Sequence, residues 1–153
     1  MQTQQALTAP SPTSSSAVDP VLLRVDPKDL SIISEAVLPM IESVVARSRG
    51  RWTMIAVLRA IYEGQWDLWV VWDGQSIPMI VGTEIYTELS GRKYLGIRFA
   101  TGAGAKQYVR LIGPIEDYAR ANGCAAVDGW MRKGWAKHLP DYHMSHVLLE
   151  KDI

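Results

Sequence analysis

The sequence has little of several things that would mark a specialised class of protein. It holds a single cysteine, Cys124, among 153 residues, which excludes an intramolecular disulfide framework and leaves too few thiolates for a cysteine-based zinc site. It has no net charge, because 16 lysine and arginine residues balance 16 aspartate and glutamate residues. No overall field therefore draws the chain to nucleic acid or to an anionic membrane, and any basic site must be local.

Long hydrophobic runs are also absent. The longest, residues 69–72 and 77–81, fall far short of the roughly 18 residues that a membrane-spanning helix needs. The N-terminus lacks the basic and apolar regions of a signal peptide, so we expect cytoplasmic synthesis in a reducing compartment. What is present is a composition with 48% hydrophobic residues, which is enough to bury the core of one globular domain.

Composition divides the chain into two parts. Residues 1–20 are rich in glutamine, serine, threonine and proline and carry one charge, Asp19, so they cannot bury enough apolar surface to offset the entropy of ordering. We expect a flexible arm, or an arm held by a protein partner or a second copy of the chain. Residues 21–153 then form the folded domain.

Apolar periodicity predicts two helices at the start of this domain. The run Asp26-Pro27-Lys28-Asp29 combines a helix cap, a proline at the first helical position and an acid in the first turn. Apolar residues at three- and four-residue spacing then continue to Val45, with Pro39 expected to kink or split the helix. Thr53 begins a second helix that ends at Gly64.

The rest of the domain alternates strands with one crossover helix. Asp73-Gly74 predicts a hairpin between two antiparallel strands, and the helix that follows the third strand should be kinked at Pro114. A right-handed crossover places the next strand parallel to the third, so we predict a mixed, mainly antiparallel α/β sheet flanked by helices. The predicted strands cover residues 66–72, 77–87, 94–100, 124–130 and 142–151, with a short helical turn at 134–138.

The small-residue loop before the crossover helix is the best candidate site. Gly102 and Gly104 allow close backbone approach, the first amides of the helix lack partners, and Lys106 adds a positive charge. Such a loop fits a diphosphate chemically. Loops of this composition are also common as tight connections, and that alternative remains open.

Several fragments of the sequence carry a family resemblance. They are Leu68-Trp69-Val70, Thr83-Glu84-Ile85, Leu95-Gly96-Ile97, Ile115-Glu116-Asp117-Tyr118-Ala119-Arg120, Gly123-Cys124 and Arg132-Lys133-Gly134-Trp135-Ala136-Lys137. With the order of elements, residues 21–151 resemble the GNAT (GCN5-related N-acetyltransferase) fold and, within it, a group of bacteriophage and prophage GNAT-like proteins.

The resemblance implies a place for acetyl-CoA. In the family this molecule lies along a splayed strand, and backbone amides of an Arg/Gln-x-x-Gly-x-Gly/Ala loop hold its diphosphate. The implied binding residues here are Phe99, Ala100, Gly102, Ala103, Gly104, Ala105, Lys106 and Gln107. Arg98 stands one residue too far from Gly102 for the family pattern, so the loop is a degenerate form.

The resemblance also implies two catalytic groups and no metal. An amine acceptor needs a base, for which Glu84 is the candidate, and the leaving thiolate needs an acid, for which Tyr142 is the candidate. The alternatives are a solvated strand carboxylate for Glu84 and a core or rim aromatic for Tyr142. His143 and His146 would lie on opposite faces of a strand, which does not suit one metal ion.

Two functions follow from these observations. The degenerate loop and the N-terminal arm favour a phage-type GNAT-fold protein that serves as a virion or assembly component and is incorporated into a phage particle. The glycine loop, Lys106 and Glu84 favour the alternative, an acetyl-CoA-dependent N-acetyltransferase that modifies a primary amine of a small molecule or a protein. Arg132, Lys133 and Lys137 with two neighbouring tryptophans form a basic and aromatic patch that would suit nucleic acid or a phosphorylated ligand. The favoured alternative is solvated charges that flank two core tryptophans.

Overall fold

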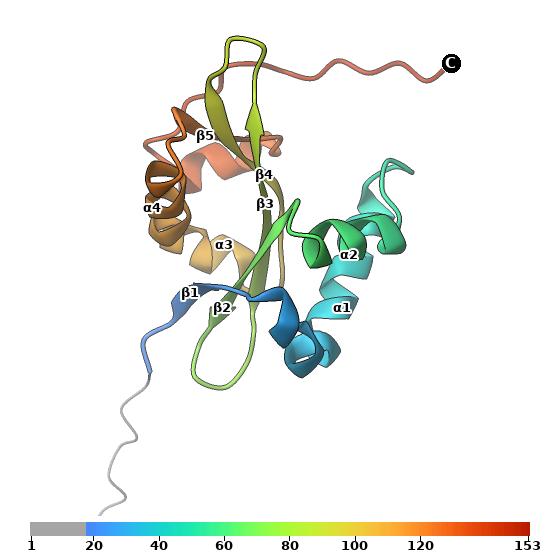
Figure 1. Cartoon of the computed structure of the whole chain (residues 1–153), viewed down its shortest axis with the longest axis vertical. Coiled ribbons are helices and arrows are strands. Elements are labelled where there is room, and N and C mark those ends of the chain that lie inside the picture. Colours follow the sequence, from blue (N-terminus) through green and yellow to red (C-terminus); the bar gives the residue numbers. More distant parts are fainter. Residues whose placement is uncertain (1–17) are drawn as a thin grey trace, which may run out of the picture.

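A computed structural model of the chain describes residues 18–153 (Figure 1). The predicted arm, residues 1–20, lies almost entirely outside the described residues, so its expected contact with a partner stays a prediction. Within the part of the chain that is described, no helix is both long and apolar enough to cross a membrane.

The centre of the molecule is a five-stranded mixed sheet. Its order is β1-β2-β3-β4-β5, with the first four strands antiparallel and β4 parallel to β5, which confirms the predicted sheet and the parallel crossover. The strands are β1 (Val21–Arg24), β2 (Asp67–Trp72), β3 (Met79–Thr87), β4 (Lys93–Thr101) and β5 (Ala126–Gly129).

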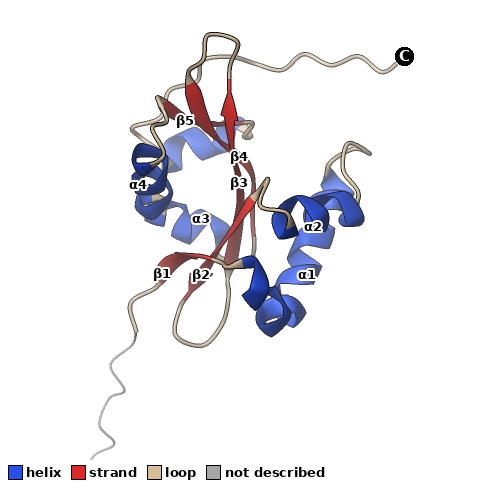
Figure 2. Ribbon diagram, in the orientation of Figure 1, coloured by secondary structure: helices blue, strands red, loops and turns tan. Residues whose placement is uncertain are grey.

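Helices cover both faces of this sheet (Figure 2). On one face lie α1 and α2, and on the other α3 and α4, with short 3-10 turns between and after them. The helical elements are η1 (Pro27–Asp29), α1 (Leu30–Arg47), α2 (Met54–Tyr62), α3 (Ala105–Tyr108), η2 (Val109–Leu111), α4 (Gly113–Ala121) and η3 (Lys133–His138).

Strand alternation sends side chains into two separate cores. Leu68 and Val70 of β2 pack with α1 and α2, whereas Trp69 and Val71 pack toward α3 and α4. Because both faces of β2 are covered, its sequence is apolar throughout rather than alternating. The predicted start of each of these helical segments is confirmed. The side chain of Asp26 accepts a hydrogen bond from the Lys28 amide, and that of Thr53 accepts one from the Ala56 amide.

Three predicted elements differ from the structure. The helix α1 is continuous through Pro39, so the proline does not split it. The crossover helix is broken into α3, η2 and α4, with Pro114 in the first turn of α4 rather than at a kink in its middle, where its missing amide donor is not needed. The first strand, β1, was not among the predicted strands.

The largest correction concerns the C-terminus. Residues 142–151 were expected to form the last strand, but residues 143–153 have no regular secondary structure. A strand needs a partner for its amides and carbonyls, and this segment leaves the sheet instead. The strand β5 is therefore at the edge and, with four residues, shorter than predicted.

Candidate functional site

The strands β4 and β5 separate partway along their length and leave an opening in the sheet. Their pairing ends at Ile97 opposite Gly129, while β4 continues to Thr101. A bulge lies at the same level, because Gly82 pairs with Phe99 but Thr83 pairs with Ile97, which leaves Arg98 as the extra residue of β4. The ring of Phe99 covers Gly82 so closely that a Cβ there would lie 2.2 Å from it, so glycine at position 82 makes room for the bulge.

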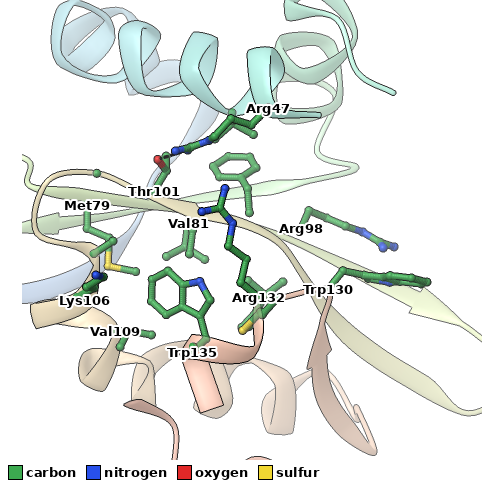
Figure 3. A pocket seen from close by; sticks show the side chains of 18 of the residues that line it. Arg47, Met79, Val81, Arg98, Thr101, Lys106, Val109, Trp130, Arg132 and Trp135 are labelled. Carbon is green, nitrogen blue, oxygen red and sulfur yellow. Dashed lines mark hydrogen bonds between the residues drawn. The ribbon is translucent and has the colours of Figure 1, made fainter. Parts of the chain in front are cut away.

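A groove of about 1260 Å³ runs along this opening. Its floor is apolar, formed by buried residues such as Met79 and Val81 of β3, Ile97 of β4 and Val109 of η2. The indole of Trp135 lies over this floor, and Arg132 reaches up toward Arg47 from the same side of the groove (Figure 3).

The rim of the groove is strongly positive although the whole chain is neutral. Seven of the chain's 16 lysine and arginine residues line it, against one of its 16 acids, Glu150. The seven are Arg47, Arg49, Arg51, Arg98, Lys106, Arg132 and Lys137. A concave surface with this imbalance attracts an anionic ligand.

The predicted loop forms one end of the groove. Six of the eight residues implied for acetyl-CoA line it, while Gly104 and Gln107 do not. The six are Phe99, Ala100, Gly102, Ala103, Ala105 and Lys106. The amides of Ala103 and Lys106 donate to no backbone carbonyl among the described residues, so they remain free for a ligand.

The backbone geometry of the loop itself requires glycine at position 102. Gly102 has φ +132°, and a Cβ there would lie 2.2 Å from the carbonyl oxygen of Pro78. The loop therefore needs glycine at position 102 to pass Pro78, whether or not a ligand approaches. In addition, α3 has only four residues, so a helix dipole contributes little here.

The two predicted catalytic residues lie in different surroundings. Glu84 of β3 is held by Arg98, whose Nε and a terminal nitrogen lie 2.7 Å and 2.6 Å from the same oxygen, Oε2. Oε1 has no hydrogen-bond donor among the described residues. Glu84 does not itself line the groove, but its partner Arg98 does.

Tyr142 lies away from the groove lining. It packs against the core under α3 and α4, and its hydroxyl is buried without a hydrogen-bond partner among the described residues. Burial, with a smaller contribution from nearby Glu116, raises the pKa of this phenol to about 12. The structure therefore does not bring Glu84 and Tyr142 together in the groove, and their catalytic roles stay predictions.

Sequence reasoning missed three of the seven cations of the basic rim, Arg47, Arg49 and Arg51. It noted the patch around Arg132 and Lys137, and both line the groove with Trp130 and Trp135. Trp130 is 69% exposed, so it is not the core residue that the alternative required. Nothing in the sequence pattern marked Arg47, whose terminal nitrogen donates to Thr101 Oγ1 at 2.7 Å, as a neighbour of the loop.

The site shows no arrangement for a metal ion. No group of three or more histidine, cysteine, aspartate or glutamate side chains in residues 18–153 has the geometry to hold one. The chemistry of the groove is thus that of cationic side chains, free backbone amides and an apolar floor.

Comparison with known proteins bears on the fold. No protein-family model and no curated protein matches the sequence. Solved structures do match: a ribosomal-protein-alanine N-acetyltransferase from Brucella melitensis biovar Abortus is 10% identical, with a TM-score of 0.64, and the match covers 89% of this chain and 99% of that one.

Two other acetyltransferases are similar. A GNAT family acetyltransferase from Staphylococcus aureus is 12% identical with a TM-score of 0.61, over 89% of this chain and 100% of that one. An aminoglycoside acetyltransferase from an uncultured soil metagenomic sample, in complex with sisomicin, is 12% identical with a TM-score of 0.61, over 88% and 96%. Membership of the phage group stays a prediction, but the likeness across most of each chain shows that this chain has the GNAT fold.

Proposed function

We propose that this protein is an acetyl-CoA-dependent N-acetyltransferase that acts on a primary amine. The observation that carries the proposal is the groove between β4 and β5, with its positive rim and apolar floor. Acetyl-CoA is divided in the same way, because its phosphates are anionic and its acyl-bearing arm is uncharged. Seven cations around one groove of a neutral chain compensate that charge where it binds.

The free edge of β4 supports the same ligand. From residue 98 to residue 101 the strand has a partner only on its β3 side, so its other edge presents unpaired backbone groups to the groove. An extended arm that contains amides pairs with such an edge as an added strand does. The amides of Ala103 and Lys106 stand at the end of this edge, where a phosphate would follow.

The likeness to acetyltransferases supports the reaction class rather than the acceptor. The similar structures include enzymes named for an aminoglycoside and for the alanine of a ribosomal protein, and both acceptors present an amine. We therefore assign the acceptor only as a primary amine of a small molecule or a protein. The acetyltransferases that are similar in structure support this reading, and none of them supports the virion role.

The reaction asks two things of the protein. Acetyl transfer forms a carbon–nitrogen bond, breaks the carbon–sulfur bond and moves a proton from the amine toward the sulfur, so a base and an acid are needed. In this proposal Glu84 accepts the amine proton at Oε1, while Arg98 fixes the carboxylate through Oε2. Tyr142 is the predicted acid that protonates the leaving thiolate. Tyr108, which lines the groove, is the alternative candidate for this acid.

Calorimetric titration with acetyl-CoA tests the proposal, with CoA and 3′,5′-ADP as comparison ligands. We expect micromolar binding, which corresponds to about −8 kcal/mol. Gly104→Glu is unsuitable as a test of site, since a Cβ there would come within 2.7 Å of the Tyr108 ring. Ala103→Glu is preferable because Ala103 is exposed on the groove, and its added charge should oppose the phosphates.

Ala103→Gln is the matched control, because it has the same size without the charge. We expect Ala103→Glu to weaken binding at least tenfold and Ala103→Gln to weaken it about twofold, the difference being one like charge beside the phosphates. Release of free thiol in the presence of polyamines, aminoglycosides or lysine peptides then identifies the acceptor, and loss of turnover in Tyr108→Phe or Tyr142→Phe identifies the acid. Absence of acetyl-CoA binding at millimolar concentration would overturn the proposal.

A further inference from the structure

The C-terminal segment, residues 143–153, follows an unusual course. It leaves the side of the sheet covered by α3 and α4 and ends near the turn between α1 and α2, which belong to the other side (Figure 1). After the Tyr142 amide donates to the Leu139 carbonyl, no residue of this segment makes a backbone hydrogen bond to the described chain. Only Leu148 and Glu150 of the segment line the groove.

Ion pairs anchor this segment at the mouth of the groove. Arg49 Nη1 lies 2.7 Å from Glu150 Oε1, and Arg51 pairs with the other oxygen, Oε2. Arg49 also reaches Asp152, at 3.5 Å. The Glu150 side chain is 25% exposed, against 66% and 58% for the two arginines, so the carboxylate is the better enclosed member of the group.

The turn that carries the two arginines has a strained backbone. Arg49 has φ 56°, and no other non-glycine residue among those described has a positive φ. This conformation costs a residue with a side chain about 1–2 kcal/mol. The turn is braced by Ser48, whose Oγ donates to the Val45 carbonyl and accepts from the Trp52 amide.

The left-handed conformation ends α1 at the residue after its C-cap, Ser48. Here it directs two guanidinium groups, two residues apart, onto one carboxylate. Guanidinium groups bind both carboxylates and phosphates, since each presents oxygens that match the planar donors.

We propose that Arg49 and Arg51 form an anion-binding subsite at the mouth of the groove, which takes a phosphate or carboxylate group of a ligand, and that Glu150 occupies it in the absence of ligand. The carboxylate of Glu150 is thus an internal stand-in for the ligand's anion. The subsite rests on the proposed function only in that both use the same groove.

The occupant is weakly held. Exposed ion pairs contribute about 0.2–1 kcal/mol each, and no strand or helix holds the segment in place. An anion of higher charge therefore displaces Glu150 and releases residues 143–153 from the groove. Two pairs of this strength correspond to an affinity that is about two- to thirtyfold lower than for the vacant subsite.

Titration of the full-length protein with pyrophosphate at low salt tests the subsite. We expect Glu150→Gln to lower the Kd of pyrophosphate about two- to thirtyfold. Glu63→Gln is the matched control, because Glu63 is an exposed carboxylate paired with Arg59 on α2 and does not line the groove. It should change the Kd less than twofold.

A triple variant locates the effect. Adding Arg49→Gln and Arg51→Gln to Glu150→Gln should abolish the gain in affinity for pyrophosphate, because the two arginines that bind the anion are then absent. A gain that persists in the triple variant, or a Glu150→Gln protein that binds pyrophosphate no more tightly than the native chain, would overturn the subsite. Unchanged thermal unfolding of the variants, which alter only exposed residues, excludes a folding defect.

Further titrations identify the class of ligand and distinguish the subsite from the proposed function. Titration with succinate in place of pyrophosphate tests whether the subsite takes a carboxylate. The anion whose Kd falls more in Glu150→Gln represents the class of ligand that the subsite takes. Acetyl-CoA that fails to bind, together with a normal pyrophosphate response, would contradict the proposed function and leave the subsite standing. Acetyl-CoA binding without any pyrophosphate response to Glu150→Gln would contradict the subsite alone.

Discussion

At the scale of single residues, Tyr142 combines a buried hydroxyl with the absence of a partner. Its hydroxyl has no hydrogen bond among the described residues, and an unsatisfied buried donor costs about 1–3 kcal/mol. We expect Tyr142→Phe, which keeps the ring, to raise the free energy of unfolding by about 1 kcal/mol. Urea denaturation at neutral pH measures this, and a destabilised variant would show that the hydroxyl has a partner after all.

The same substitution changes the dependence of stability on pH. Burial raises the pKa of Tyr142 to about 12, above the usual value of about 10, so the folded state binds the phenolic proton more tightly than the unfolded state. The contribution of this group is complete below pH 10 and is lost as the pH rises from 10 to 12. In Tyr142→Phe, that part of the alkaline loss of stability should be missing.

Residue patterns identified one part of the site and missed the other. The small-residue loop was visible because glycine, alanine and lysine are adjacent in sequence, and six of its implied residues line the groove. The basic rim was hidden because its members come from residues 47–51, 98–106 and 132–137. Only tertiary packing brings these three segments together, and no local pattern encodes that.

At the scale of elements, the two halves of β4 have different surroundings. Residues 93–97 lie between β3 and the β5 segment, whereas residues 98–101 have a strand partner only on the β3 side. Amides that face the groove from 98–101 should therefore exchange with solvent faster than those of 93–97. They should become protected when acetyl-CoA binds.

Hydrogen exchange followed by mass spectrometry or NMR measures both effects. Residues 80–83 of β3, which are paired with strands on both sides, are the internal reference. Equal protection along the whole of β4 in the free protein would contradict the opening of the sheet.

Elements were predictable where their causes are local. Caps, turn residues and apolar alternation lie within a few residues of each helix or strand. The order β2-β3-β4-β5 followed from them and from the right-handed crossover. The strand predicted at residues 142–151 is absent from the structure, because an extended, partly apolar pattern is not sufficient for a strand. The segment does not pair with the open edge of β5. Instead, Glu150 forms ion pairs with Arg49 and Arg51 in the turn after α1.

At the scale of the whole molecule, the decisive property is how charge is distributed, since the net charge is zero. Cations gather at one groove, and the acids that balance them lie elsewhere apart from Glu150. A protein of this kind has little long-range attraction for polyanions but a strong local one for a small anion that enters the groove. Salt should weaken that local attraction, because the Debye length falls from about 10 Å at 0.1 M to about 3 Å at 1 M ionic strength.

We therefore expect the Kd of CoA to rise about tenfold between 0.1 M and 1 M NaCl. Pantetheine is the matched control ligand, because it keeps the apolar arm and its amides without the phosphates. Its Kd should stay nearly constant, since burial on the apolar floor of Met79, Val81 and Ile97 does not depend on charge screening. If both ligands weakened equally, the positive rim would have no part in binding, and the groove would recognise its ligand through the floor and the edge of β4 alone.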